Sequence, residues 1–446
     1  MKTYLKRFLI ALCCQLMFLS FQTTVAIHPF SSSSVISSIK YLSSDNLKGR
    51  LAGSAENYDA QMYIEKQLKD NQLLAYNSSY LDQFSAVCPV KIEGSPYLRV
   101  VDKNNNSVVK EYKYGTDYKE DLLNFRKNNF TFDSSSSYTI QKNVALIKDG
   151  NNQFVFYTPE DDNLSFRSSF MEKSDQSMFI MVKKQLLSEM QLYINNGCKI
   201  ECFIPYKTQT MKLNNVVGVI KGKNPTLAPL ILTAHFDHVG TDLNGNIYNG
   251  ALDNASGISF ILEMSKYVKS LGIPDRDIIF AAFNGEELGL KGSSAFALKY
   301  KNHLSGSKVF NFDMIGSKAA VPLSIMGSKN DTAKTSLIKS ASDICQSTHT
   351  YYNYLFTDGS DHEPFRKINV DALTFCDSDL SVIHTPEDTA DKINSSSITR
   401  CFNVSSVEVI NNAYGNNPML TYYLPVFCLS ITILLVVFLI EKIKKD

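Results

Sequence analysis

The chain has 446 residues, of which 44% are hydrophobic, so it is long enough for two or three domains with a large core. Its 45 lysines and arginines nearly balance its 44 aspartates and glutamates, which leaves a net charge of +1. Phosphate recognition normally needs a basic excess or a basic stripe, and this sequence has neither. The composition therefore argues against nucleic-acid binding.

The N-terminus has the pattern of a secretory signal peptide. A basic start that ends at Arg7 is followed by an apolar stretch over residues 8–21 and by the small-residue sequence Thr24-Val25-Ala26. This order predicts a signal peptide over residues 1–26, cleaved near Ala26. The alternative is an uncleaved anchor, which is less favourable because the apolar stretch is short and contains Gln15.

Two differently patterned regions follow. Residues 34–74 have apolar side chains at helical spacing around a glycine turn, and they predict two helices within an N-terminal part of the main domain, residues 27–84. Residues 85–211 have Asn-rich and Ser-rich spacers between short β-like runs, such as 154–157 and 178–182. We expect this stretch to be a separate, strand-rich insertion.

From Asn215 onward, predicted strands and helices alternate within a main domain that we place at residues 212–415. The predicted elements are strands over 216–220, 230–233, 277–283 and 309–315 and helices over 257–268 and 289–298. Such alternation is typical of an α/β fold with a mostly parallel sheet that is covered on both faces. Ligands of these sheets bind outside the carboxyl ends of the strands, where four acidic or imidazole side chains lie: His235, Glu286, Glu287 and Asp313.

The C-terminal region predicts a membrane anchor. Residues 420–440 are apolar over the length that crosses a bilayer, with Tyr422 and Tyr423 suited to the interface. The lysines of residues 441–446 suit a cytoplasmic tail. Together with the signal peptide, this transmembrane helix leaves the main domain outside the cytoplasm. The alternative is a buried hydrophobic helix.

Five short segments contain a ligand set for two metal ions. Zinc binds imidazole nitrogen and carboxylate oxygen, and two zinc ions about 3.5–4 Å apart need a bridging group, for which a carboxylate serves. We predict Asp253 as the bridge. His235 and Asp313 then complete one ion, and Glu287 and His384 complete the other. The predicted cofactor is two Zn²⁺ per chain.

The residues beside these ligands predict a hydrolytic mechanism. Glu286 precedes a ligand on a turn where adjacent side chains diverge, so it can act as general base on the water between the two ions. Asp237, two residues beyond His235, is placed to accept the other imidazole N–H and fix the tautomer. Each segment alone is a weak signal, because similar segments are common in turns and caps. Four other histidines show that the site does not need every histidine: His238, His303, His349 and His362.

The same segments resemble metallopeptidase family 28, the co-catalytic zinc aminopeptidases. The resemblance lies in residues 234–240 (AHFDHVG), 250–257 (GALDNASG), 283–289 (FNGEELG), 311–316 (NFDMIG) and 384–389 (HTPEDT). It covers residues 34–74, with LSSDNLKGR at 42–50, and residues 215–411. It implies a three-layer α/β/α fold with a mixed sheet of about eight strands, a cis Asp253–Asn254 peptide, and a pocket-lining segment at 360–365 (SDHEPF).

Two positions depart from what the resemblance implies. Relatives often have a tyrosine near the SDHEPF segment that steadies the reaction intermediate, whereas this chain has Thr357 there and three tyrosines slightly upstream. The oxyanion partner is therefore unassigned. The insertion occupies the place where some relatives have a protease-associated domain, but it resembles that domain only faintly.

The sequence favours a zinc-dependent aminopeptidase that acts on peptides and is anchored to a membrane, and it leaves the oligomeric state open. A glutaminyl cyclase of similar fold is the first alternative, but those enzymes usually have a Trp before the final ligand, where this chain has Ile383. A receptor-like relative would have lost ligands, and none is lost here. A carboxypeptidase or dipeptidase of the same fold also stays open.

Overall fold

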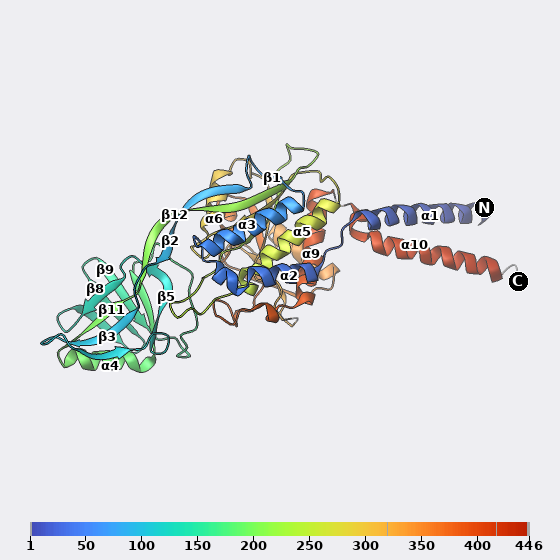
Figure 1. Cartoon of the computed structure of the whole chain (residues 1–446). Helices are drawn as coiled ribbons and strands as arrows, with labels where there is room; N and C mark the ends of the chain where they lie inside the picture. The colour runs from blue at the N-terminus through green and yellow to red at the C-terminus, as the bar shows by residue number, and fades with distance from the viewer. Residues whose placement is uncertain (1, 319, 416, 444–446) are drawn as a thin grey trace.

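The structure is a computed structural model that describes residues 2–318, 320–415 and 417–443. Figure 1 shows three parts in a row: a strand-rich body, a larger body of helices around a sheet, and two long helices. The long helices are α1 (Lys2–Ala26) and α10 (Pro418–Ile443), and both termini lie at their far end. The predicted anchor and the predicted signal peptide therefore coincide with the two helices that leave the body.

A nine-stranded sheet forms the centre of the larger body, in the order β1-β12-β14-β13-β15-β18-β16-β17, with β2 also paired to β12. Its strands are β1 (Leu74–Ala75), β2 (Leu81–Lys91), β12 (Tyr206–Ile220), β13 (Leu230–His235), β14 (Ile278–Phe283), β15 (Lys308–Phe312), β16 (Leu323–Gly327), β17 (Tyr352–Phe356) and β18 (Asp371–Asp377). The sheet is mixed, as the resemblance implies. The parallel share is smaller than the sequence predicts, because four pairings are parallel and four are antiparallel.

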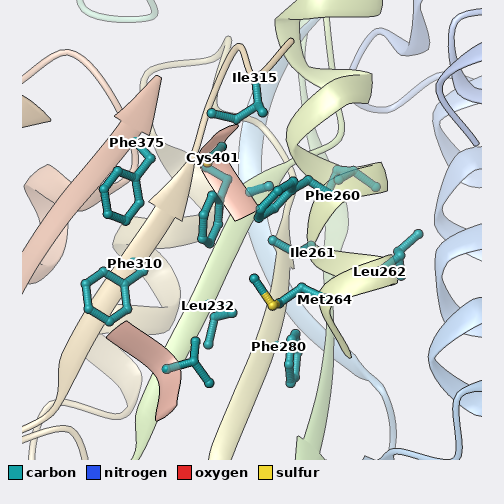
Figure 2. Close-up of a cluster of buried hydrophobic side chains, with 14 of the residues drawn as sticks. Leu232, Phe260, Ile261, Leu262, Met264, Phe280, Phe310, Ile315, Phe375 and Cys401 are labelled. Atoms are coloured by element: carbon teal, nitrogen blue, oxygen red, sulfur yellow. The ribbon is translucent and has the colours of Figure 1, made fainter. Parts of the chain in front are cut away.

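Helices cover both faces of this sheet and complete the three-layer fold. One layer contains α2 (Ser32–Leu42), α3 (Ala55–Asp70), α5 (Ser256–Ser270), α7 (Ser336–Ser347) and α9 (Ser395–Ala413), and the other contains α6 (Lys291–Lys299) and α8 (His362–Lys367). Successive residues of a strand point to opposite faces, so Phe280 packs in the first core and Ile279 in the second. Figure 2 shows Phe260, Ile261 and Met264 of α5 pointing toward the sheet side chains Leu232 and Phe280.

The strand-rich body has its own hydrophobic core. A four-stranded sheet contains β3 (Tyr97–Asp102), β4 (Val108–Tyr112), β6 (Asn129–Phe132) and β11 (Cys198–Phe203). A five-stranded sheet contains β5 (Tyr118–Phe125), β7 (Ser137–Gln141), β8 (Val144–Asp149), β9 (Asn152–Tyr157) and β10 (Met178–Val182), and α4 (Lys184–Asn195) packs beside them. The long β2–β12 ladder joins the two bodies, and the predicted boundaries of the insertion fall within it. Those boundaries stay a prediction.

The two long helices lie side by side (Figure 1). Each is long and apolar enough to cross a membrane by length and composition. Phe21 and Phe427 are 6.2 Å apart between ring centroids, and Lys6 forms an ion pair with Glu441 near the far end. The predicted span over residues 420–440 lies within α10. Met1 and residues 444–446, which end the predicted tail, lie outside the described part of the chain.

Candidate metal centre

Three neighbouring parallel strands bring the predicted ligands to one edge of the sheet. His235 is the last residue of β13 and lies opposite Phe283, the last residue of β14. Glu286 and Glu287 follow β14 after one turn, and Asp313 follows β15 on the other side of β13. Because parallel strands end at the same edge, residues that are far apart in the sequence meet there.

The first group of ligand atoms contains His235, Asp253 and Asp313. His235 Nε2 lies 3.4 Å from Asp253 Oδ1 and 3.5 Å from Asp313 Oδ1. Asp313 Oδ1 is buried and has no hydrogen-bond partner within the described residues. A buried carboxylate oxygen without a partner is costly in a folded protein, and a bound cation would satisfy it.

The second group contains His238, Asp253, Glu287 and His384. His384 Nε2 lies 3.1 Å from Asp253 Oδ2 and 3.0 Å from Glu287 Oε1. His238 Nδ1 lies 3.1 Å from the same Glu287 oxygen and 3.7 Å from Asp253 Oδ2. His238, which the sequence does not predict as a ligand, therefore lies within reach of the second group. The imidazole faces the ligands because the turn after β13 brings it back toward Gly250, where a Cβ would meet its ring.

The donor set of both groups fits divalent metal ions. The ligand atoms of each group lie within 4.8 Å of one another, they are buried, and they are imidazole nitrogens and carboxylate oxygens. These are the donors that zinc takes in catalytic sites. Asp253 belongs to both groups, so its two oxygens face two positions, which is the geometry of a bridging ligand.

Buried polar groups fix the loops that hold these ligands. Asp388 accepts hydrogen bonds from the backbone N–H groups of Leu252 at 2.7 Å and Asp253 at 3.0 Å. The Asp253–Asn254 peptide is cis, as the resemblance implies. Ser360 donates to Asp313 Oδ2 at 2.6 Å. The SDHEPF segment therefore supports a ligand from behind. It does not itself line the cavity, contrary to what the resemblance implies, although the preceding residue Gly359 does.

Arg50 joins the two loops on either side of the centre. Its buried guanidinium donates to Phe236 O at 2.9 Å, next to His235, and to Asn249 O and Gly250 O at 2.8 and 2.9 Å. It also donates to Leu42 O. The periodicity of the LSSDNLKGR segment predicts only a helix and a glycine turn, and gives no role to Arg50. Its resemblance to the family was the signal that could have identified this arginine.

Asp237 holds the Glu286–Glu287 turn. Its carboxylate accepts the backbone N–H of Glu286 at 3.0 Å and that of Glu287 at 3.1 Å. The ring nitrogen Nδ1 of His235 lies 3.2 Å from the backbone carbonyl of Asp237 and 3.7 Å from its Oδ1. Asp237 thus lies against the imidazole of His235 as predicted, but its backbone carbonyl oxygen is nearer to the ring than its carboxylate is. The carboxylate has a second task that the sequence did not indicate.

A cavity of about 400 Å³ opens over the two groups. The ligand side chains His235, Asp253, Glu287, Asp313 and His384 line it with Glu286, together with five apolar residues: Met314, Met326, Leu355, Leu380 and Ile383. Thr357, which stands where relatives often have a tyrosine, is not among the described residues that line the cavity, whereas Asn353 is. Among the residues that the structure describes, no lysine or arginine lines this cavity. The lining of this cavity, which we call the chamber, therefore combines acidic and apolar side chains.

The electrostatics of the chamber suit proton transfer by Glu286. Burial raises the pKa of Glu286 well above its usual value, while positive charge on His235 opposes the rise and the Glu287 carboxylate adds to it. Burial also raises the pKa of Asp361, behind the ligands, to about 7. For Asp253 burial acts in the same direction, but hydrogen bonds from His235 and His384 outweigh it and hold the pKa well below its usual range. Adjacent carboxyls with pKa values shifted apart are typical of catalytic sites.

Comparison with known proteins identifies relatives of this region. Residues 215–409 match the model of Peptidase family M28, which confirms the resemblance. The aminopeptidase YwaD of Bacillus subtilis is 31% identical over 217 residues, which are 44% of this chain and 45% of YwaD. A vacuolar membrane protease of Kluyveromyces lactis is 30% identical over 36% of this chain and 16% of its own length. The chain thus spans less than half the length of these curated relatives.

Solved structures share the fold over both bodies. The aminopeptidase from Aneurinibacillus sp. strain AM-1 aligns with a TM-score of 0.60 and 19% identity, over 86% of this chain and 94% of its own. BSAP, a zinc aminopeptidase from Bacillus subtilis, aligns with a TM-score of 0.61 and 18% identity, over 86% and 96%. At these identities the alignments establish the fold alone.

Proposed function

Because residues 215–409 match the model of Peptidase family M28, we propose that the chain is a zinc-dependent aminopeptidase that removes N-terminal residues from peptides. Two zinc ions are the proposed cofactor. His235, Asp253 and Asp313 would hold one ion, and Asp253, Glu287 and His384 would hold the other, with His238 beside the second. The zinc aminopeptidase among the structural relatives supports this choice of metal.

The observation that carries the aminopeptidase proposal is the lack of lysine and arginine side chains among the described residues that line the cavity. Five carboxylates line it, but Asp253, Glu287 and Asp313 would bind the ions and Asp377 pairs with Arg400. The distinguishing feature is that no described lining residue is a lysine or an arginine. A carboxypeptidase must bind a free carboxylate, for which arginine is the usual partner. A free amino group instead requires acceptors and negative charge. The chamber therefore supports recognition of the N-terminus of a peptide.

The chain's own residues can perform the proton transfers of hydrolysis. When bound, the zinc ions polarise the scissile carbonyl and lower the pKa of water. The Glu286 carboxylate accepts the proton that the attacking water loses and then donates it to the nitrogen of the leaving peptide. Asp237 keeps this carboxylate in place through the backbone N–H of Glu286. Burial of the centre strengthens each of these interactions.

The apolar residues that line the cavity support a preference for apolar N-terminal residues. The side chains of Met314, Met326, Leu355 and Ile383 line it together with the exposed Leu380. A leucine or methionine side chain buried there gains about 1.5–3 kcal/mol of transfer free energy. A charged side chain gains none and has to lose its hydration.

Aminoacyl-anilide hydrolysis by the detergent-solubilised full chain tests the proposal. We expect cleavage of leucyl-anilide, much less of glutamyl-anilide, none of acetyl-leucyl-anilide, and loss of activity with a zinc chelator. Glu286→Gln should lower kcat by about 10²–10⁴-fold, because it removes the general base. Glu111→Gln, an exposed glutamate of the insertion that does not line the cavity, is the matched control. Cleavage of only the blocked substrate would exclude an aminopeptidase, and cyclisation of a glutaminyl peptide would favour the cyclase.

We also propose that the site lies outside the cytoplasm, at a membrane to which α10 anchors the chain. The support is the apolar composition of α10 and its place at the end of the body opposite the insertion. Protease protection of sealed vesicles tests the orientation. The N-terminal sequence of the purified chain tests cleavage near Ala26, which stays a prediction.

A further inference from the structure

A segment of the insertion lies directly against the metal centre. We call residues 164–171 the strap; it belongs to the irregular connection between β9 and β10. Phe170 donates its backbone N–H to Glu287 O at 2.7 Å, and Arg167 donates its own to His384 O at 3.0 Å. The strap thus binds the main chain of two residues of the second ligand group.

Side chains of the strap contact the same two residues. Ser169 donates its hydroxyl to Glu287 Oε2 and lines the cavity. Phe166 stacks on the imidazole of His384, with ring centroids 5.8 Å apart and planes 20° apart. The Ser169 bond and the imidazole contacts lie on different oxygens of Glu287, because Oε1 faces His384 and His238. The carboxylate is therefore held at both oxygens.

The strap is fixed at its base by buried polar contacts. The guanidinium of Arg167 donates to Val239 O at 2.9 Å and to Thr241 O, in the loop that follows His238, and to Tyr206 Oη at 2.9 Å. It also lies 3.6 Å from Glu120 Oε1, and both side chains are fully buried. Arg167 therefore joins the insertion to the loop behind the metal centre. Ser169 is held by a rigid support.

The first ligand group has an equivalent hydroxyl from the main domain. Ser360 donates to Asp313 Oδ2 while Asp313 Oδ1 faces His235. In both groups a serine fixes one oxygen of a carboxylate and leaves the other for the ion. Partners of this kind orient metal ligands, and their loss typically costs about 10–100-fold in metal affinity.

We propose that Ser169 is a positioning residue for Glu287, through which the insertion contributes to retention of the zinc ion held by Glu287 and His384. This inference rests on the zinc-binding part of the proposed function and not on peptidase activity. The insertion is then part of the active site and not only a spacer or a surface for partners. The contact between the insertion and the main domain then affects how tightly one ion is bound.

Zinc titration of the metal-free full chain tests the proposal. The chain is stripped with a chelator and titrated with Zn²⁺ against a chromophoric competitor, for wild type and Ser169→Ala. We expect a rise of about 10–100-fold in the dissociation constant of one ion and no change in that of the other. Ser169→Thr keeps the hydroxyl and should restore the affinity. Ser168→Ala is the matched control, because that hydroxyl donates to Asp121 within the insertion.

The same titration in a Glu287→Ala variant tests which ion Ser169 affects. In Glu287→Ala, Ser169→Ala should cause no further loss of affinity, because its partner is already absent. If Ser169→Ala bound each of the two ions as tightly as wild type does, the inference would be overturned and the proposed function would stand. A further loss in the Glu287→Ala background would also overturn it. Failure of the wild type to bind Zn²⁺ would overturn the proposed function itself.

Discussion

The two groups of metal ligands differ in which part of the chain holds them in place. Asp313 of the first group is held by Ser360, and both residues belong to the main domain. Glu287 and His384 of the second group are contacted by the strap of the insertion. The first group therefore depends on the main domain alone, whereas the second also depends on how the two bodies fit together.

This difference has a consequence for assembly of the centre. Side chains at the ends of paired strands are positioned as soon as the sheet forms. The strap reaches its place only when the insertion has folded and Arg167 has entered the loop after β13. We expect changes that break the contacts of the strap with Glu287 or His384, or with the loop after β13, to weaken binding of the second ion and to leave the first unchanged.

The largest effect is expected from Asp253, which the two groups share. Asp253→Ala removes the bridging carboxylate, so both ions lose a direct ligand. We expect both dissociation constants to rise by more than the roughly 100-fold that loss of an outer partner causes. Metal analysis after dialysis measures bound zinc per chain, and Asp391→Ala, on the exposed surface, is the control. Two retained ions would show that Asp253 is not the bridge.

Arg167→Met should have the next largest effect, and it separates the two groups. The substitution leaves Glu120 buried without its ion pair, which typically costs about 3–5 kcal/mol of stability. Denaturant unfolding of the full chain measures this cost, and zinc titration should show weakening of the second ion only. Arg99→Met breaks a partly exposed pair with Glu201 in the same body and should cost about 0–1 kcal/mol. Equal losses in the two variants would contradict a special role for Arg167.

Ser360→Ala tests the first group of ligands in the way that Ser169→Ala tests the second. It removes the hydrogen bond to Asp313 Oδ2 and should raise the dissociation constant of the first ion by about 10–100-fold. The effect should vanish in an Asp313→Ala background and persist in Glu287→Ala. If Ser360→Ala instead weakened the ion that Ser169→Ala weakens, the two groups would not be separable.

The sequence could predict that His235, Glu287 and Asp313 lie close together, because each is at or just after the end of a strand. Residue types that bind zinc at the ends of parallel strands converge whatever the details of packing are. The same argument reached Glu286, whereas Asp253 followed from the need of two zinc ions for a bridging carboxylate. The three-layer fold also followed from the alternation of elements. The share of parallel pairings did not, because a buried apolar strand looks the same in either direction.

The partners of the ligands could not be predicted in this way. Ser169 lies 118 residues before Glu287, in a segment without periodicity, so no local pattern connects the two. His238 is in a segment that the sequence identified, but its direction depends on the turn that follows β13 and on space above Gly250. Contacts of this kind arise from tertiary packing.

The smallest effect is expected from Phe166, at the outer end of the strap. Its ring stacks on His384, and such pairs contribute about 0.5–1.5 kcal/mol beyond their buried area. Phe166→Ala should therefore raise the dissociation constant of the second ion by about 2–13-fold. Met171→Ala is the matched control, because this side chain is also in the strap and is 55% exposed. Zinc titration compares the two variants with wild type.

The ordering of the strap variants is itself a test of how the insertion acts. If the strap holds the second group through Glu287, then Ser169→Ala must weaken the second ion more than Phe166→Ala does. An effect of Phe166→Ala equal to or larger than that of Ser169→Ala would mean that the strap acts through His384. In that case the aromatic cover, and not the hydroxyl, would be the contribution of the insertion to the centre.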